Sequence, residues 1–469
     1  MKVRAPLIVA ACSLILASAA ADAADLITVY QRALQNDPQI READALRLAS
    51  RESKPQALAS LLPQVDASGS AEKFKSDGSS LFADTDESGV TTFINRDTEN
   101  DTETLAYQVQ LRQPVFRWDQ WMTLKRADAE VAQAEADYQF AQQDLIQRTS
   151  IRYFDVLAAQ DTVDAAQASL DAFARQLEQA EKRFEVGLIA ITDVQEARAA
   201  HDQAAAALIQ AKRTLATARE LLRELTGESF DQLAAPVDDL PLKSPDPASE
   251  DQWVTTALDQ NLQVISARLA TDIAKQDVRV ARAGHLPSLD IVATHAGSED
   301  SGTRTVTNPG TPPLNVPADA DGRSDSISLQ VTVPIYSGGG TSSRVRQQVY
   351  LHRAARERLE RANRETERLA RDSYLGVLSE ISRVRALRQA LESSQTALQA
   401  TEAGFEVGTR TTVDVLDARR QLFEAQTNYL RSRYDYILNV LALQLATGTL
   451  DRADLEEINT YLRERNITR

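Results

Sequence analysis

The chain has 469 residues and a formal net charge of −16, with 52 Lys and Arg against 68 Asp and Glu. This acidic excess disfavours nucleic-acid binding, because a protein needs basic side chains to neutralise phosphates. Glycine and proline are scarce, at 17 and 15 residues, and aromatic residues make up only 5% of the chain. The composition therefore predicts long uninterrupted helices and excludes a core built mainly from large rings.

The N-terminus has the pattern of a secretory signal. Lys2 and Arg4 precede a run of apolar and small residues that ends in Ala-Asp-Ala at 21–23. This order predicts a signal peptide over residues 1–23. Lipoprotein processing at Cys12 is an alternative, but it would cut the chain before the apolar run has ended. Cys12 is the only cysteine, so the mature chain can form no disulfide and no thiolate metal site.

The sequence repeats itself over two halves. Phe-Glu-Val-Gly at 184–187 recurs at 405–408, an offset of 221 residues. The same offset relates Asp193-Val194 to Asp414-Val415, Ala197-Arg198 to Ala418-Arg419, and Thr226-Gly227 to Thr447-Gly448. A constant offset over so many positions predicts an internal twofold repeat.

The boundaries of this repeat follow from composition. We predict a first repeat over 24–235 and a second over 250–450, joined by the Pro- and Asp-rich linker 236–249. Residues 451–469 then form a C-terminal segment at the equator of the molecule.

Each half contains two segments in which apolar and polar residues alternate. The alternation predicts strands with one apolar and one polar face. The predicted strands are 64–74, 104–113, 288–296 and 325–333. Residues 75–103 and 297–324 lack this pattern, and they are predicted to be long polar loops between the strands.

Heptad spacing predicts long coiled helices. Apolar residues recur at intervals of four and three along 118–183 and along 191–226, which is the seam of a coiled coil. The second seam is predicted to consist of Val194, Ala197, His201, Ala204, Leu208, Ala211, Leu215, Ala218, Leu222 and Leu225. The two helices would form a hairpin over 118–227, and the second half would repeat it over 341–448.

Shorter helices are predicted over 26–36 and 38–61, with a break at Pro38. The helices 38–61 and 191–226, stacked end to end, would nearly match 118–183 in length at about 1.5 Å per residue. This match predicts a rod of coiled helices with the strands at one end and the glycine turns at the other.

The strands allow two interpretations. The mature chain has no apolar run long enough for a transmembrane helix, so a membrane role would require a β-barrel. Strands of about ten residues can cross a membrane, with one face toward lipid and one toward the lumen. The same alternation also fits a small soluble sheet with one wet face. Since the smallest outer-membrane barrels have about eight strands, four strands per chain would have to be shared among two, three or four chains.

Four passages resemble the TolC family of outer-membrane efflux and secretion channels. The passages are 183–199 (RFEVGLIAITDVQEARA), 284–290 (GHLPSLD), 334–339 (PIYSGG) and 402–419 (EAGFEVGTRTTVDVLDAR). The resemblance extends over about 24–455. It implies a mainly α-helical chain with a membrane β-barrel, in which a trimer closes a 12-stranded barrel from four strands per chain. A long coiled α-helical barrel would form a tunnel in the periplasm.

The resemblance also implies a function. A homotrimer in the outer membrane, surrounded by lipid, would export small molecules or proteins. It would be recruited by a periplasmic adaptor (a membrane fusion protein) and by an inner-membrane efflux pump or an ABC exporter. We expect no enzymatic activity, no cofactor, no metal site and no nucleic-acid partner. The alternative function is a soluble periplasmic coiled-coil scaffold or adaptor.

The family's periplasmic gate maps onto two acids of this chain. Its ring of carboxylates corresponds to Asp414 and Asp417. The spacing i, i+3 places both on one helix face, so three chains would bring together six carboxylates that attract cations. From spacing alone, both residues could equally be ordinary solvated surface acids.

The family's gate latch maps onto Arg410, which would contact Thr192 and Asp193 on the neighbouring coil. A tyrosine normally reaches the same aspartate, but Phe405 occupies that position and has no hydroxyl. The loss of one hydrogen bond predicts a closed gate weaker by about 0.5–1.5 kcal/mol. From the residues alone, the Thr-Asp pair could equally cap the N-terminus of a helix.

The family's adaptor-facing turns correspond to Val186-Gly187-Leu188 and Val407-Gly408-Thr409. Both glycines are predicted to adopt positive φ at the ends of helices. That conformation is a structural requirement under either function, so the turns alone do not establish docking.

Overall fold

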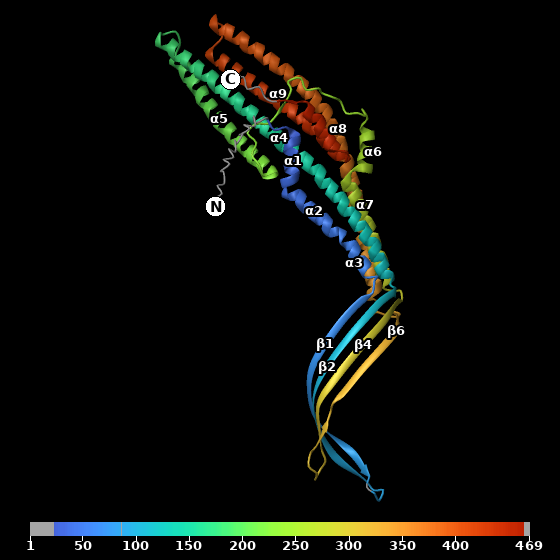
Figure 1. Ribbon diagram of the computed structural model, residues 1–469. Helices are drawn as coiled ribbons and strands as arrows, with labels where there is room; N and C mark the ends of the chain where they lie inside the picture. The colour runs from blue at the N-terminus through green and yellow to red at the C-terminus, as the bar shows by residue number, and fades with distance from the viewer. Residues whose placement is uncertain (1–22, 86, 464–469) are drawn as a thin grey trace, which may run out of the picture. The chain divides into compact units, whose positions relative to one another are not determined.

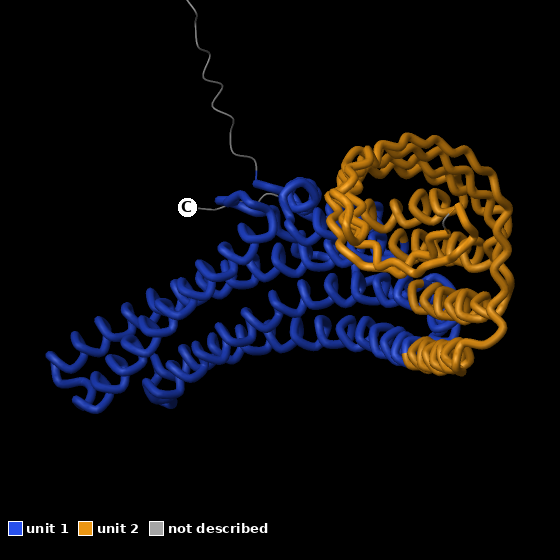
Figure 2. The backbone as a smooth tube through the Cα atoms, turned by 90° about the horizontal axis from the view of Figure 1, so that it is seen from below, with its two compact units in different colours: residues 1–45, 136–265, 362–469 blue, residues 46–135, 266–361 orange. Residues whose placement is uncertain are grey.

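The computed structural model describes residues 23–85 and 87–463. Residues 1–22, with nearly all of the predicted signal peptide and Cys12, lie outside the described residues, as do residues 464–469 of the predicted C-terminal segment. The chain divides into two compact units (Figure 2). Unit 1 comprises Met1–Ala45, Ala136–Ile265 and Ala362–Arg469, and unit 2 comprises Leu46–Glu135 and Ser266–Arg361.

Unit 2 contains an antiparallel sheet (Figure 1). Its strands are β1 (Gln64–Thr85), β2 (Thr91–Phe116), β4 (Ser288–Thr307), β5 (Leu314–Pro317) and β6 (Ala320–Thr332). β2 pairs with β1 and β4, and both β5 and β6 pair with the far side of β4. Within the described residues, β1 and β6 therefore each have one unpaired edge.

The strands extend into the predicted loops, which corrects the sequence analysis. β1 and β2 stay in register from Gln64–Arg112 to Thr85–Thr91, so most of residues 75–103 is strand. Ion pairs link the two strands there at 2.6 Å, from Lys73 to Glu103, and at 2.7 Å, from Lys75 to Asp101. This outer part of the ribbon is mainly polar on both faces, and it is held by backbone bonds and cross-strand charge pairs. Its sequence therefore has no hydrophobic period to reveal it. β4 and β6 also run beyond their predicted bounds, and the short β5 is an additional strand.

One face of the sheet is apolar close to the ends of the strands that connect to the helices. Val65, Leu111, Ala293 and Ile327 lie side by side in register across the four long strands. Val65 and Ile327 are 64% and 84% exposed, and Leu111 and Ala293 are partly exposed. Successive side chains alternate between the two faces of a sheet. The next row, on the other face, consists of Asp66, Gln110, Thr294 and Ser326, and it is polar.

Four long helices form two hairpins. The first consists of α4 (Trp118–Glu185) and α5 (Ile191–Thr226), and the second of α8 (Gly340–Glu406) and α9 (Thr412–Thr447). Their bounds lie close to those expected from the heptad spacing. In the seam of α5, every predicted residue is buried except His201, which is half-buried beside Asp202 at 3.0 Å. Among the described residues, no helix is both long and apolar enough to cross a membrane.

The remaining elements are short. The helices are α1 (Leu26–Asn36), α2 (Pro38–Arg51), α3 (Ser53–Ala59), α6 (Glu250–Gln260), α7 (Leu262–Ala283) and α10 (Arg452–Thr460), and β3 (Ala235–Pro236) pairs with β7 (Leu462–Arg463). The predicted helix 38–61 is thus two helices. The break falls where Pro55 enters the first turn of α3, because proline cannot donate the helical hydrogen bond to the preceding turn.

The core of unit 1 surrounds two aromatic residues of α4. Tyr153 and Phe154 are completely buried. Their rings meet edge to face at 5.3 Å, and Phe154 stacks on Tyr434 of α9 at 5.7 Å. Leu26 of α1 and Leu455 of α10 belong to the same buried cluster. This cluster joins both hairpins to the N- and C-terminal helices.

Candidate functional site at the tips of the helical hairpins

Each hairpin turns at a glycine with a left-handed backbone. Gly187 has φ 75° and Gly408 has φ 81°, as the sequence predicts. Each turn contains two backbone hydrogen bonds that together form a Schellman motif. The bonds run from Gly187 to Phe184 (2.9 Å), Leu188 to Arg183 (2.9 Å), Gly408 to Phe405 (3.1 Å) and Thr409 to Gly404 (2.8 Å). The two tips therefore have the same local geometry.

The turns present apolar side chains to solvent. Val186, Leu188 and Val407 are 70%, 73% and 75% exposed. The hydroxyl of Thr409 instead donates to the carbonyl oxygen of Gly404 at 3.1 Å. In the chain by itself, both predicted docking turns are thus small, rigid and accessible.

Asp414 caps the N-terminus of α9. Its carboxylate accepts a hydrogen bond from the backbone N–H of Thr411 at 2.8 Å and another from the Thr411 hydroxyl at 3.0 Å. The Thr411 oxygen in turn accepts from the N–H of Asp414 at 3.3 Å, which completes a capping box. These hydrogen bonds hold the pKa of Asp414 below its ordinary value, with a smaller contribution from Arg410. The stabilisation is present above the ordinary carboxyl pKa and is lost as pH falls through the lowered value.

Asp417 lies one turn further along α9 and pairs with Arg420 at 2.8 Å. Both side chains are about half exposed, so this surface pair contributes little to stability. Asp414 and Asp417 share one face of the helix, as their spacing predicts. Each acid has a partner within its own chain, and the predicted ring of carboxylates remains a prediction about several chains.

The predicted latch residues are not joined within the chain. The carboxylate of Asp193 accepts a hydrogen bond from the backbone N–H of Ala190 at 3.2 Å, so Asp193 caps α5 as Asp414 caps α9. In the part of the chain that the structure describes, no hydrogen bond or ion pair links Arg410 to Asp193 or to Thr192. The alternative, that Thr192 and Asp193 cap the helix, holds in part: the N-cap residue is Ala190, and Asp193 at the third helical position accepts its N–H. The latch stays a prediction.

Phe405 has a different neighbour from the one that the resemblance implies. The guanidinium of Arg183, in the last turn of α4, lies over the Phe405 ring with its Cζ atom 4.8 Å from the ring centroid. Both side chains are half-buried. This is the geometry of a cation–π interaction. The sequence analysis did not identify Arg183, because the contact depends on how the two hairpins pack.

Two equivalent ion pairs join the two helices of each hairpin near its tip. Arg198 pairs with Glu181 at 2.8 Å, and Arg419 pairs with Glu402 at 2.7 Å. Both members of the second pair lie 221 residues after those of the first. The repeat offset was therefore a signal that could have identified both pairs from the sequence.

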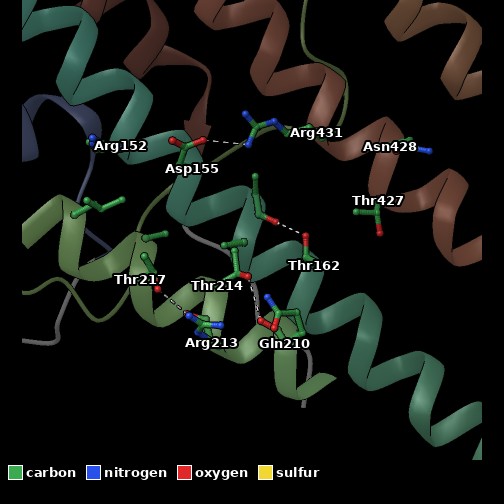
Figure 3. A pocket seen from close by; sticks show the side chains of 14 residues that line it. Arg152, Asp155, Thr162, Gln210, Arg213, Thr214, Thr217, Thr427, Asn428 and Arg431 are labelled. Carbon is green, nitrogen blue, oxygen red and sulfur yellow. Dashed lines mark hydrogen bonds and ion pairs between the residues drawn. The ribbon is translucent and has the colours of Figure 1, made fainter. Parts of the chain in front are cut away.

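A cavity of about 570 Å³ lies between α4, α5 and α9 in unit 1 (Figure 3). Arg152, Arg213 and Arg431 line it, together with several threonines and Asp155. Arg431 is paired with Asp155 at 3.1 Å. The lining can donate hydrogen bonds to a polar or anionic group, but it contains no arrangement of residues for catalysis.

Comparisons with known proteins identify the family of this chain. Residues 29–228 and 253–449 match the model of the outer membrane efflux protein family. The chain belongs to the outer membrane efflux protein family. It is 35% identical to the outer membrane protein TolC of Vibrio cholerae, over 99% of both chains. It is 36% identical to the outer membrane protein TolC of Escherichia coli, over 95% of this chain and 86% of that one.

The fold is shared with a solved structure. A crystal structure of CusC superposes with a TM-score of 0.71 at 18% sequence identity, covering 90% of this chain and 92% of that one. The protein is thus an outer-membrane channel of the efflux and secretion class. Members of the outer membrane efflux protein family are transport proteins, and the family is not one of enzymes.

Proposed function

We propose that three copies of this chain form a channel-tunnel that exports small molecules, proteins or both. In this proposal, a periplasmic adaptor and an inner-membrane efflux pump or ABC exporter recruit the trimer. The pump supplies the energy and selects the cargo, and the channel itself is passive.

The observation that carries the proposal is a sheet with two unpaired edges and an uncovered apolar face. β1 is a 22-residue edge strand, and β6 is the opposite edge. Long unpaired edges invite pairing with another chain. Pairing β1 of one copy with β6 of the next satisfies both edges. Three copies would then close a 12-stranded barrel from the four long strands of each chain, in accordance with the family resemblance.

The sheet has the features of a surface that contacts lipid. Near the helices its apolar face is exposed along β1 and β6, including Val65, Ile327 and Leu329. Trp118 and Trp121, which are exposed, follow the helix-side end of β2, where an aromatic belt would meet the membrane interface. In the alternative, a soluble scaffold, this apolar face would be in contact with water, which favours aggregation.

The proposed gate lies at the hairpin tips. Three chains would bring Asp414 and Asp417 into a ring of six carboxylates that attracts cations and repels anions. Arg410 would contact Thr192 and Asp193 only when neighbouring coils are packed in the closed trimer. The exposed apolar turns at Val186–Leu188 and Val407–Thr409 would be the surface to which the adaptor docks.

The test is conductance of the purified, detergent-extracted protein in a planar lipid bilayer. We expect a small cation-selective conductance that divalent or trivalent cations block. The double variant Asp414→Asn/Asp417→Asn should need about tenfold more cation for the same block, because the carboxylates that hold the cation are gone. Glu424→Gln, an exposed acid further along α9, should leave the block unchanged.

Other outcomes would contradict the proposal. A protein that leaves the membrane in a carbonate wash and forms no channel would be the soluble scaffold. An unchanged block in the double variant would show that Asp414 and Asp417 are surface acids. An Arg410→Ser channel with wild-type conductance would count against the proposed latch.

A further inference from the structure

The two hairpins of unit 1 touch each other near their tips. Leu416 of α9 is buried against Phe173 of α4 and Ala204 of α5. Arg419 donates a hydrogen bond from Nη1 to the carbonyl oxygen of Ala172 at 3.2 Å. The contact closest to the turns is that of Arg183 with the ring of Phe405. Any movement of the second hairpin away from the first must separate Arg183 from Phe405.

The hairpin turns hold both partners of this contact. The carbonyl oxygen of Arg183 accepts the hydrogen bond from Leu188, and that of Phe405 accepts the one from Gly408. Each backbone is thus fixed by its own Schellman motif, next to a glycine with positive φ. The backbones that carry the guanidinium and the ring are therefore both held by hydrogen-bonded turns.

The chemistry of the pair suits an interaction between hairpins. An aromatic ring attracts a cation to its face, and the attraction grows as water is excluded. Within the described ranges, 23–85 and 87–463, Arg183 forms no ion pair that would compete for its charge. Phenylalanine binds a cation through its ring face, so the absence of the tyrosine hydroxyl does not remove the attraction.

We propose that Arg183 and Phe405 form a clasp that holds the hairpin tips together when the gate is closed. This inference rests on the proposed function, since it assigns residues to the closed state of that gate. The clasp joins α4 to α8 within one chain, so a trimer contains three clasps. It accounts for a closed tip in a chain where Phe405 replaces the hydrogen-bonding tyrosine.

The clasp differs from an ion-pair latch in its response to salt. At about 1 M salt the Debye length is about 3 Å, so exposed ion pairs are strongly screened, whereas half-buried contacts are screened much less. The clasp should therefore keep the channel closed in 1 M KCl nearly as well as in 0.1 M KCl. A latch that depends on Arg410 and Asp193 alone should weaken over the same range.

The first experiment measures the open fraction of single channels in bilayers. Arg183→Met removes the charge and keeps the length of the side chain, and Phe405→Leu removes the ring and keeps an apolar group. Each should raise the open fraction about two- to fivefold at both salt concentrations. Phe405→Tyr keeps the ring face and should stay closed. Arg175→Met changes an exposed arginine two turns earlier on α4 and should resemble the wild type.

The double variant Arg183→Met/Phe405→Leu tests whether the two residues act as a pair. It should open no more than either single variant, because the first substitution already removes the interaction. Effects that multiply would show independent structural roles and would overturn the clasp. Wild-type behaviour of both single variants, with opening in Arg410→Ser, would assign closure to the ion-pair latch instead.

A second experiment does not depend on conductance. In the variant Arg183→Cys/Phe405→Cys, a short thiol cross-linker should join the two positions within one chain and change its mobility on a denaturing gel. The wild-type chain has a single cysteine, Cys12, so a Cys12→Ser background gives a clean control. Absence of the cross-link would contradict the contact itself. The cross-link should also hold the channel closed, so channel formation is tested before the cross-linker is added. A variant that cross-links but forms no channel without the cross-linker would retain the contact and contradict the proposed function.

Discussion

The variant Tyr153→Ala should lose about 3–5 kcal/mol of unfolding free energy, because it empties the centre of the largest buried cluster. Tyr153 is 0% exposed. Its hydroxyl lies 2.6 Å from the carbonyl oxygen of Ala234 and 3.1 Å from that of Ala24. The side chain therefore links α4 to two distant parts of the chain. Burial also raises the pKa of Tyr153 well above its ordinary value, so the hydroxyl stays neutral and can donate at physiological pH.

The measurement is denaturant unfolding of the detergent-solubilised protein, followed by circular dichroism. Tyr153→Phe keeps the ring and loses only the hydroxyl, so it should lose about 1–2 kcal/mol. Tyr350→Ala removes an exposed tyrosine of α8 and should change stability by less than about 0.5 kcal/mol. A Tyr153→Ala protein within about 1 kcal/mol of the wild type would show that the core can repack around the missing ring.

The helical hairpins could be predicted from the sequence because their determinants are local. A seam that repeats every three and four residues can face only one side of a helix, and Gly187 and Gly408 mark the turns. His201 occupies a seam position but is only half-buried, since it lies next to Asp202. The period identifies the face of the helix, while the chemistry of each side chain decides how deeply it is buried.

The outer parts of the strands could not be predicted in the same way. From Lys73 to Thr85, β1 and the paired stretch of β2 are mainly polar. Their few apolar residues, such as Phe74, Leu81 and Phe82, do not alternate with polar ones. Apolar and polar residues alternate only where one face of a strand is apolar and the other is polar. The alternation therefore predicts an earlier end for the strand than the structure has. The pairing is instead decided between strands, by the backbone register and by ion pairs such as Lys75 to Asp101.

In the candidate site, too, the local features could be predicted from the sequence and the contacts between hairpins could not. The glycine turns were predicted, and the alternative of a Thr192-Asp193 helix cap is met in part, by the hydrogen bond from Ala190 to Asp193. Both depend on residues within one helical turn of each other. The contact of Arg183 with Phe405 and the packing of Leu416 join residues of different hairpins. Nothing near them in the sequence indicates such contacts, which depend on how the helices pack.

Loss of the charge on Arg117, at the end of the sheet, should lower the free energy of unfolding by an amount similar to the loss of the Tyr153 side chain. Asp290 of β4 has a side chain only 3% exposed. Arg117, just before α4, donates to both of its oxygens, at 3.0 Å and 2.7 Å. A second arginine, Arg112, is 3.5 Å away. The pair ties the start of a long helix to the strand beside it.

The variant Arg117→Met should therefore leave a buried carboxylate with Arg112, at 3.5 Å, as its remaining partner, and we expect a loss of about 3 kcal/mol in denaturant unfolding. Arg117→Met/Asp290→Leu should be more stable than the single variant, because no unpaired charge is then buried. Lys73→Met, which breaks an exposed ion pair on the same sheet, should shift the unfolding midpoint little. A single variant no less stable than the double variant would mean that water reaches Asp290. In that case the junction would be held by the backbone pairing of β2 with β4 rather than by this ion pair.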